Sequence, residues 1–465
     1  MNDIHYTEKG TKRKETVIKG DGLYLVDSGA KYTNGGTTDA TRTVAVGTPT
    51  EEQKDRFTRV LKGHIALADV TFPPKTPGTK LDSLARQFLW EVGLNYNHGT
   101  GHGVGSYLGV HEAPGTNFGN GLLVPIEEGM VLSNEPGFYK ETIKKQEKSK
   151  GEKGYGIRIE SLMSSIPSLR KGFLCFKTIT LVPIDKRLIE VKMLTDKELL
   201  WLNNYHNTIF RMLSPYVNMT SFTYPWLVEA TTPIDRDYEE GMLFIKRNPK
   251  NKEDIKKGLE LIHKSAEREH ITSQKSLANL YFFGYGDLLL QNKDAAFKWL
   301  SQVVEKENVD PEEIDNIALM YEYGWGTKLD KQKALALTLK AADPNGIGGG
   351  CASAQYRLGS WYKMGWMVKE DKKESDKWFK LAHNNQGDPI SDDLLKKFTD
   401  HLSNYKSTVC AIWLAQFYET GQANLSNKEK VPELDKAIDY YHQALILGEP
   451  RAQEKIEWLK KHTQK

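Results

Sequence analysis

The chain has 465 residues, with 64 Lys and Arg residues against 61 Asp and Glu residues and a formal net charge of +3. This length predicts two or three domains, because a single hydrophobic core rarely extends over so many residues. The balanced charge excludes the strong basic excess that is typical of nucleic-acid-binding and membrane-surface proteins. We therefore expect neither a nucleic acid nor a membrane as a partner.

No apolar stretch approaches the roughly 18 residues needed to span a bilayer, and the first residues contain no apolar segment of a secretory signal. Cys175, Cys351 and Cys410 lie far apart and form no CxxC pair. Such cysteines are typical of a reducing compartment, where they act as small buried hydrophobic residues. These features predict a soluble, cytoplasmic protein.

The first elements in chain order are two strands, over residues 22–32 and 37–47, with a turn at 34–36 that contains two glycines. A helix is expected over 50–68, because a threonine and two acids precede apolar residues at helical spacing. A second helix is expected over roughly 79–93, ending at a glycine.

Further strands are expected around 130–134, over 155–165 and over 176–184, followed by a helix over 195–213 that begins at Thr195. Strands and helices are mixed without strict alternation. Residues 1–234 are therefore predicted to form an α+β domain.

From residue 235 to 465 the strand patterns are replaced by a degenerate helical repeat. Its marker is an apolar and small residue pair followed by Tyr-x-x-Gly, with tyrosines 40, 41 and 56 residues apart, namely Tyr281, Tyr321, Tyr362 and Tyr418. Each marker opens a pair of helices, in which we expect the small residue and the glycine to permit close helix contact. The pattern predicts an all-α solenoid of αα-hairpins.

The most unusual stretch is NHGTGHGVGSYLGVHEAP at residues 97–114, which places His98, His102 and His111 among closely spaced glycines. Imidazoles ligate metals when neutral and titrate near pH 7. Glycines allow close approach of the backbone in a tightly packed site. The stretch is a candidate for metal binding or proton transfer, although glycine-rich loops with stray histidines also occur in ordinary proteins.

Four carboxylates lie in apolar or glycine-rich surroundings where an unpaired acid is costly to bury, namely Asp27, Asp39, Glu135 and Glu160. Each of them alone is typical of a strand end or a turn. Together with a histidine, they have the composition of a two-metal site, in which carboxylates bridge two cations that activate a water molecule.

These motifs resemble the catalytic domain of the cytosolic Xaa-Pro aminopeptidases, which belong to the pita-bread metallopeptidases. The matching stretches include YLVDSGAKY, GGTTDATRTVAVGTPT, HGTGHGVGSYLGVHEAP, VLSNEPGFY and GIRIESL, with IHY at residues 4–6. The resemblance covers about residues 1–234. It implies a pita-bread fold and hydrolysis of the first peptide bond of peptides with proline at position two.

The resemblance also implies the metal ligands. Asp27 and Asp39 would ligate the metals, with Asp39 bridging; His102 and Glu135 would bind the second metal, and Glu160 would bridge both. Two divalent ions are implied, manganese by preference, with zinc or cobalt as substitutes. The carboxylate-rich composition agrees with manganese.

Further catalytic roles follow from the same resemblance. Glu135 would handle the proton of the bridging water, and His111 would stabilise the tetrahedral intermediate. His98 and His5 would line the substrate pocket, and Arg158 would lie beside the bridging glutamate.

The chain departs from the family pattern because it begins three residues before the IHY motif, so we expect the opening segment of the pita-bread domain to be missing. The alternative function is a catalytically impaired remnant that serves, with the repeats, as a protein-binding scaffold. A rearranged gene product joined to a repeat protein is a third interpretation. The region 235–465 resembles Sel1-like repeats, which implies a protein partner on the solenoid. The other interpretation is that the repeats only pack on the first half.

Overall fold

In the computed structural model, the described residues are 18, 20–33, 35–106, 109–112, 124–141, 154–284, 289–306, 309–385, 392–405, 407–421 and 433–463. The chain divides into two compact units. The first extends to Leu213 and includes Val228–Ile234, and the second contains Ser214–Leu227 and the residues from Asp235 onward. The domain border after residue 234 stays a prediction.

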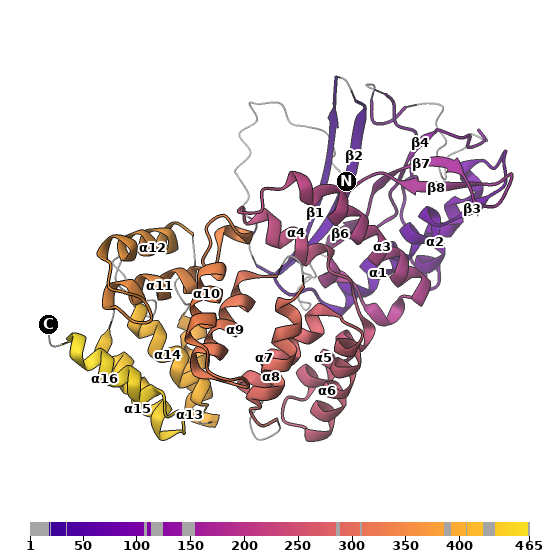
Figure 1. Ribbon diagram of the computed structural model, residues 1–465. Coiled ribbons are helices and arrows are strands. Elements are labelled where there is room, and N and C mark those ends of the chain that lie inside the picture. The colour runs from indigo at the N-terminus through magenta and orange to yellow at the C-terminus, as the bar shows by residue number, and fades with distance from the viewer. Residues whose placement is uncertain are drawn as a thin grey trace, which may run out of the picture. The chain divides into compact units, whose positions relative to one another are not determined.

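The first unit is α+β, as predicted, and its first described elements are β1 (Gly22–Lys31) and β2 (Thr37–Val46), which form an antiparallel hairpin (Figure 1). In its register Asp27 lies opposite Thr41, and Gly29 lies opposite Asp39. Since side chains alternate between the two faces of a strand, Asp27, Asp39 and Thr41 share one face of the hairpin. The predicted strands are therefore confirmed, and they bring two of the predicted site residues together.

Two helices follow the hairpin. The first, α1 (Glu51–Ala68), begins with a capping box in which Thr50 and Gln53 exchange side-chain to backbone hydrogen bonds. The second, α2 (Asp82–Trp90), is shorter than predicted, because a 3-10 turn (Gly78–Lys80) precedes it and it ends before Gly93. The two helices pack closely at Gly63, where an added Cβ atom would lie 2.1 Å from the carbonyl oxygen of Ala85.

A four-stranded sheet has the order β3-β8-β7-β4, and β5 pairs with β6 in a separate two-stranded sheet. Their bounds are Thr71–Phe72 (β3), Val131–Asn134 (β4), Gly137–Lys140 (β5), Tyr155–Arg158 (β6), Ser161–Pro167 (β7) and Leu174–Thr178 (β8). The single strand predicted over 155–165 is thus wrong, because it is divided between β6 and β7 in different sheets. The break falls at Glu160, whose N–H donates to the carbonyl of Thr41 on β2 at 3.0 Å.

The last long helix of the first unit is α3 (Asp196–Leu213), which begins where it was predicted. Thr195 and Glu198 exchange hydrogen bonds at its start, as in a capping box. The sequence did not predict the short helix α4 (Thr223–Thr231). Three further 3-10 turns connect these elements, at Lys186–Leu188, Val191–Met193 and Ser214–Tyr216.

The described residues of the second unit from Asp235 onward form helices without any strand, as predicted (Figure 1). Their bounds are Arg236–Arg247 (α5), Lys252–Glu267 (α6), Ile271–Phe283 (α7), Lys293–Val304 (α8), Pro311–Tyr323 (α9), Lys331–Ala341 (α10), Ala352–Met364 (α11), Lys372–Asn384 (α12), Asp392–Tyr405 (α13), Thr408–Thr420 (α14), Leu434–Ile446 (α15) and Ala452–Thr463 (α16). The four tyrosine markers lie on α7, α9, α11 and α14, which pack against α8, α10, α12 and α15.

The glycine of the marker has a different role from the one predicted. Gly324, Gly365 and Gly421 end their helices with φ angles of 65°, 69° and 77°, a conformation that glycine adopts without strain. The small residue does allow close contact, since a Cβ atom on Gly359 would lie 2.9 Å from the ring of Phe379. The glycine therefore turns the chain between the paired helices.

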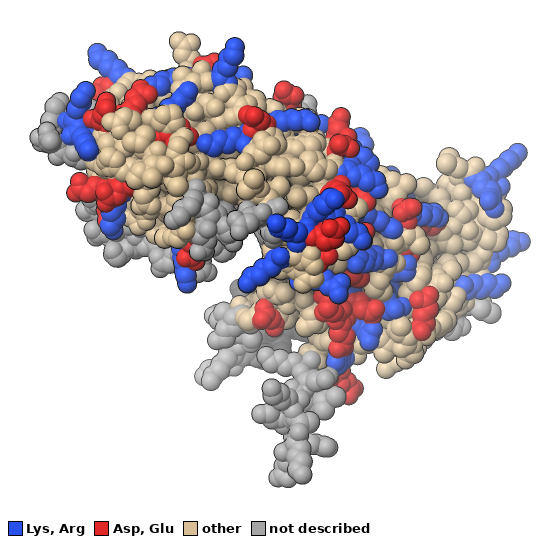
Figure 2. All heavy atoms as spheres, turned by 90° about the horizontal axis from the view of Figure 1, so that it is seen from below, with Lys and Arg blue, Asp and Glu red and all other residues tan. Residues whose placement is uncertain are grey.

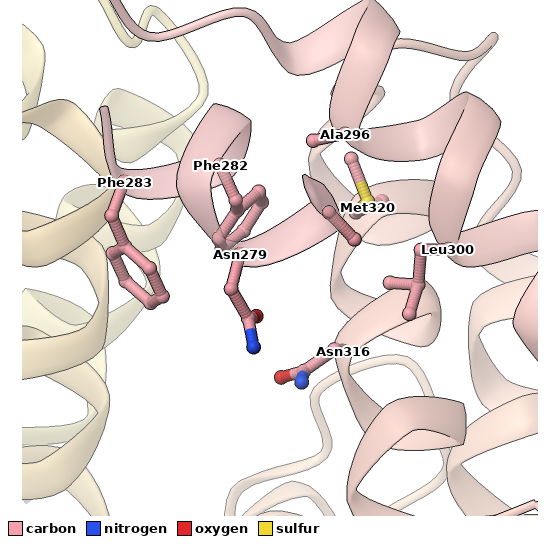
Figure 3. Close-up of a pocket in the computed structure, with 8 residues that line it drawn as sticks. Asn279, Phe282, Phe283, Ala296, Leu300, Asn316 and Met320 are labelled. Carbon is pink, nitrogen blue, oxygen red and sulfur yellow. The ribbon is translucent and has the colours of Figure 1, made fainter. Parts of the chain in front are cut away.

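Helices α7, α8 and α9 enclose a small pocket lined by Phe282, Leu300 and Met320, with Asn279 and Asn316 at its polar side (Figure 3). Its volume is only about 20 Å³, which is about the space of one water molecule. It is therefore not a candidate ligand site.

On the face shown in Figure 2, Lys and Arg side chains are interspersed with Asp and Glu side chains. Among the described helices, none combines the length and the apolar character that crossing a membrane requires.

Candidate metal centre

Residues 100–104 of the histidine-rich stretch run beside β4 and are joined to it by backbone hydrogen bonds. Gly103 forms antiparallel bridges with Leu132 and with Glu112. The N–H of Ser133 donates to the carbonyl of His102 at 2.9 Å, and the N–H of His102 donates to Oγ of Ser133 at 2.9 Å. This pairing fixes the backbone of His102 beside the strand that leads into Glu135.

Glu135 follows β4 directly, and its N–H donates to the carbonyl of Thr100 at 2.7 Å. Its Oε1 lies 3.2 Å from Nε2 of His102. Nε2 of His102 also lies 3.5 Å from Oδ2 of Asp39. The imidazole of His102 therefore contacts one carboxylate on β2 and another that directly follows β4.

Glu160 enters the same cluster from the break between β6 and β7. Thr41 donates its hydroxyl to Oε2 of Glu160 at 2.6 Å. Arg42 donates to the backbone carbonyl of Glu160 and also to the carbonyl of Val182, in the latter case at 2.7 Å. Both the side chain and the backbone of Glu160 are thus held by β2.

Asp39, His102 and Glu160 each offer a ligand atom, and these atoms all lie within 4.8 Å of one another. All three residues are buried, with exposed fractions of 7%, 8% and 2%. Among the described residues, this is the group of histidines, cysteines and acids that could hold a metal ion. Two carboxylates and one imidazole are hard or borderline ligands, which fit a divalent cation such as manganese or zinc.

The carboxylates of this cluster destabilise one another's ionised forms. Burial, the charge of Asp27 and the charge of Glu135 raise the pKa of Asp39 to about 6, although His102 opposes them. Burial and the charges of Glu135 and Asp39 raise the pKa of Glu160 to about 8. Since several acids in a buried site cannot all ionise without positive charge, a divalent cation is the kind of ligand that would stabilise the cluster.

His102 and Glu135 titrate as a pair. Burial opposes the charged imidazole, but the hydrogen bond and the charge of Glu135 outweigh it and raise the pKa of His102 to about 9. Burial likewise opposes the charged form of Glu135, but His102 lowers its pKa. A cation that binds His102 would have to displace this proton.

Asp27 lies at the side of the cluster, where it accepts a hydrogen bond from the guanidinium of Arg158. Nε of Arg158 lies 3.9 Å from Oε2 of Glu135 and donates to Oγ1 of Thr41 at 3.0 Å. Asp27 and Glu135 are not part of the compact group of three ligands. Arg158 therefore contacts Asp27, Glu135 and Thr41 at one side of the centre.

The three histidines of the glycine-rich stretch take different positions. Nε2 of His98 lies 3.0 Å from the hydroxyl of Tyr139, and burial lowers the pKa of His98. The ring of His111 packs edge-on against the ring of His102, with centroids 4.3 Å apart. His5 lies outside the described residues.

Thr41, Arg42 and Tyr139 were not among the residues expected from the sequence. Thr41 could have been found, because it lies two residues after Asp39 and therefore on the same face of a predicted strand. Arg42 and Tyr139 act through long-range contacts: Tyr139 accepts a hydrogen bond from Arg158 at 3.0 Å. No local pattern indicates such contacts.

A cavity of about 460 Å³ lies beside Gly103, and its lining includes Thr37, Val104, Glu112, Met130, Leu162 and Ile179. Most of these side chains are small or apolar. The volume is in the range of small-molecule pockets, but Asp39, His102 and Glu160 are not among the lining residues.

Residues 2–164 match the model of metallopeptidase family M24, and residues 172–234 match the C-terminal region of peptidase M24. Four segments of the second half match the Sel1 repeat, namely 272–306, 315–343, 352–384 and 408–449.

Aminopeptidase P2 of Arabidopsis thaliana is 43% identical over 219 residues, which cover 46% of this chain and 29% of that protein. The "Probable Xaa-Pro aminopeptidase P" of Aspergillus fumigatus is 45% identical over 243 residues, which cover 50% of this chain and 35% of that protein. The chain thus spans about a third of the length of these curated relatives.

A solved structure of an X-prolyl aminopeptidase from Caenorhabditis elegans, described as a cytosolic enzyme with a di-nuclear active site, is 39% identical. The similarity covers 46% of this chain and 34% of that one, with a TM-score of 0.41. The family matches agree with the α+β first unit and with the paired helices of the second. In its N-terminal half the chain therefore matches metallopeptidase family M24, with a pita-bread α+β domain, and in its C-terminal half it matches Sel1 repeats, within an all-α solenoid.

Proposed function

We propose that the first unit is a metal-dependent aminopeptidase that hydrolyses the first peptide bond of peptides with proline at position two. The observation that carries the proposal is the buried group of Asp39, His102 and Glu160, whose ligand atoms lie within 4.8 Å of one another. The two relatives named as Xaa-Pro aminopeptidase or aminopeptidase P support the choice of substrate.

Five residues would hold two divalent ions, namely Asp27, Asp39, His102, Glu135 and Glu160. Manganese is the preferred ion, and zinc or cobalt could replace it. When bound, such a pair lowers the pKa of a water molecule and polarises a carbonyl group. Asp27 would leave its contact with Arg158 to take part in this site.

The protein groups around the ions would handle protons and orientation. Glu135, whose Oε1 lies 3.2 Å from Nε2 of His102, would accept the proton of the attacking water. His111 would stabilise the oxygen of the tetrahedral intermediate from its position against His102. His98, Tyr139 and Arg158 form a hydrogen-bonded row that would orient the substrate, and His5 would join them.

A proline at position two has no N–H and a fixed φ angle, so the substrate offers few donors and a preset shape. The largely apolar cavity beside Gly103 would suit such a group. We further propose that the protein acts in the cytoplasm and that the Sel1 solenoid binds a protein partner.

The experiment is release of the first amino acid from an Xaa-Pro peptide by the purified, manganese-loaded full chain, with an Xaa-Ala peptide as the control substrate. Release from the Xaa-Pro peptide and its loss in an Asp39→Asn variant that still folds are expected. A chain that binds two ions and releases nothing would refute the peptidase activity and favour the protein-binding scaffold. Unchanged ion content in Asp39→Asn would refute the site.

A further inference from the structure

A buried histidine lies next to the strand end that precedes Glu135 of the metal centre. His64 belongs to α1, and its exposed fraction is 0%. Neither of its ring nitrogens makes a hydrogen bond to any described residue. Because buried polar groups are nearly always paired, an imidazole of this kind calls for a specific explanation.

The backbone around His64 connects it to the strand that carries Glu135. The side-chain amide of Asn134 donates to the carbonyl of His64 at 2.9 Å, and Asn134 is itself 1% exposed. Asn134 is the last residue of β4 and directly precedes Glu135. His64 is therefore fixed against the end of that strand.

The backbones of Asn134 and Ile159 are close enough to the ring of His64 to influence its titration. Burial and the charge of Arg42 lower the pKa of His64 to about 3, while the backbones of Asn134 and Ile159 act in the opposite direction. A backbone group that favours the protonated ring is an acceptor, which identifies these groups as carbonyl oxygens. Asn134 precedes Glu135, and Ile159 precedes Glu160.

The segments that carry Glu135 and Glu160 also contact each other directly, because the N–H of Ile159 donates to the carbonyl of Pro136 at 3.3 Å. This bond is long for an N–H to oxygen contact. His64 thus lies where the backbones that carry Glu135 and Glu160 meet. Its ring has an N–H that could donate to the carbonyl of Asn134 or of Ile159.

We propose that His64 is a positioning residue, which fixes the relative position of the Glu135 and Glu160 carboxylates through the backbone carbonyls that precede them. Its neutral ring has one N–H, which would donate to one of the two carbonyls when the carboxylates close on a cation. The inference rests on the proposed metal site, but it does not depend on the substrate. Residues that orient metal ligands typically change metal affinity 10- to 100-fold when they are removed, by order of magnitude.

His64→Phe in the full chain tests this inference, because it keeps an aromatic ring of similar size and removes the donor. We expect calorimetric titration with Mn²⁺ to show about 10-fold weaker binding. The free energy of unfolding of the ion-free protein should be unchanged or higher, since no hydrogen bond is lost. His64→Asn and His64→Gln each restore a side-chain N–H donor, at two different distances from the backbone. One of these two variants should recover part of the affinity for Mn²⁺ that His64→Phe loses.

The matched control is His206, which is also fully buried in the first unit and whose Nε2 accepts a hydrogen bond from the N–H of Ile184 at 3.1 Å. His206→Phe should lower the stability and leave the affinity for Mn²⁺ within about 3-fold, because among the described residues no hydrogen bond or ion pair joins His206 to a carboxylate of the centre. This control separates a loss of stability from a loss of positioning.

If His64→Phe does not fold, His64→Leu replaces it in the same titration. An apolar variant that binds Mn²⁺ as tightly as the wild type would overturn the positioning role while leaving the metal site intact. A wild-type chain that binds no ion would overturn both proposals. Equal loss of affinity in the His206 variant would also overturn the positioning role.

Discussion

Binding of a divalent cation to the centre should release about two protons at pH 7, because the ion-free cluster holds them. With pKa values of about 8 for Glu160 and about 9 for His102, both groups are about nine-tenths protonated or more at this pH. Asp39, with a pKa of about 6, contributes only about a tenth of a proton. The sum is therefore about two.

The assay is calorimetric titration of the chelator-treated full chain with Mn²⁺ in two buffers of different ionisation enthalpy at pH 7. The dependence of the measured enthalpy on the buffer gives the number of protons released. Since each displaced proton contributes a factor of about ten per pH unit, the affinity should rise about 100-fold per unit near pH 7.

Glu160→Gln should release about one proton fewer, because the amide does not titrate. The matched control is Glu312→Gln in the second unit, where burial also raises the pKa of the carboxyl group, and it should leave the count unchanged. Tight binding with release of less than about half a proton would refute the reasoning, because the ion would then bind elsewhere or the cluster would be ionised beforehand.

Two further predictions concern single contacts. Thr41→Val removes the hydroxyl that donates to Glu160 at 2.6 Å, and it should weaken Mn²⁺ binding about 10-fold in the same titration; unchanged affinity would contradict a role for Thr41. Lys455→Met breaks the ion pair with Glu419, whose atoms lie 2.8 Å apart and whose side chains are 4% and 3% exposed. It should lower the unfolding free energy by about 3–5 kcal/mol in urea denaturation. A change below about 1 kcal/mol would show that other groups balance the charge of Glu419.

Several features of the fold could be predicted because their causes are local. The capping box at Thr50 and Gln53 depends on residues three apart, and the β1–β2 hairpin depends on alternation and a glycine turn. The tyrosine markers likewise indicated the four helix pairs. Each of these patterns is complete within about 30 residues of sequence.

Other features depend on contacts between distant residues. The strand predicted over 155–165 is divided because Glu160 bonds to the backbone of Thr41, which is 119 residues away in sequence. Local apolar alternation continues through this break and therefore could not reveal it. From the sequence we expected the glycines of the repeat markers to allow close packing of helices. Their positive φ angles, by which they end the helices, could not be predicted from the sequence.

The sequence by itself determined which residue types are available for chemistry. It placed histidines among glycines and carboxylates in apolar surroundings, and a resemblance to a known family assigned roles to them. Only the tertiary structure decided which of these residues meet, because Asp39, His102 and Glu160 come from separate segments. It also decided that Asp27 pairs with Arg158 and that His64 lies next to the residue that precedes Glu135. Such neighbours depend on how distant segments fold against one another.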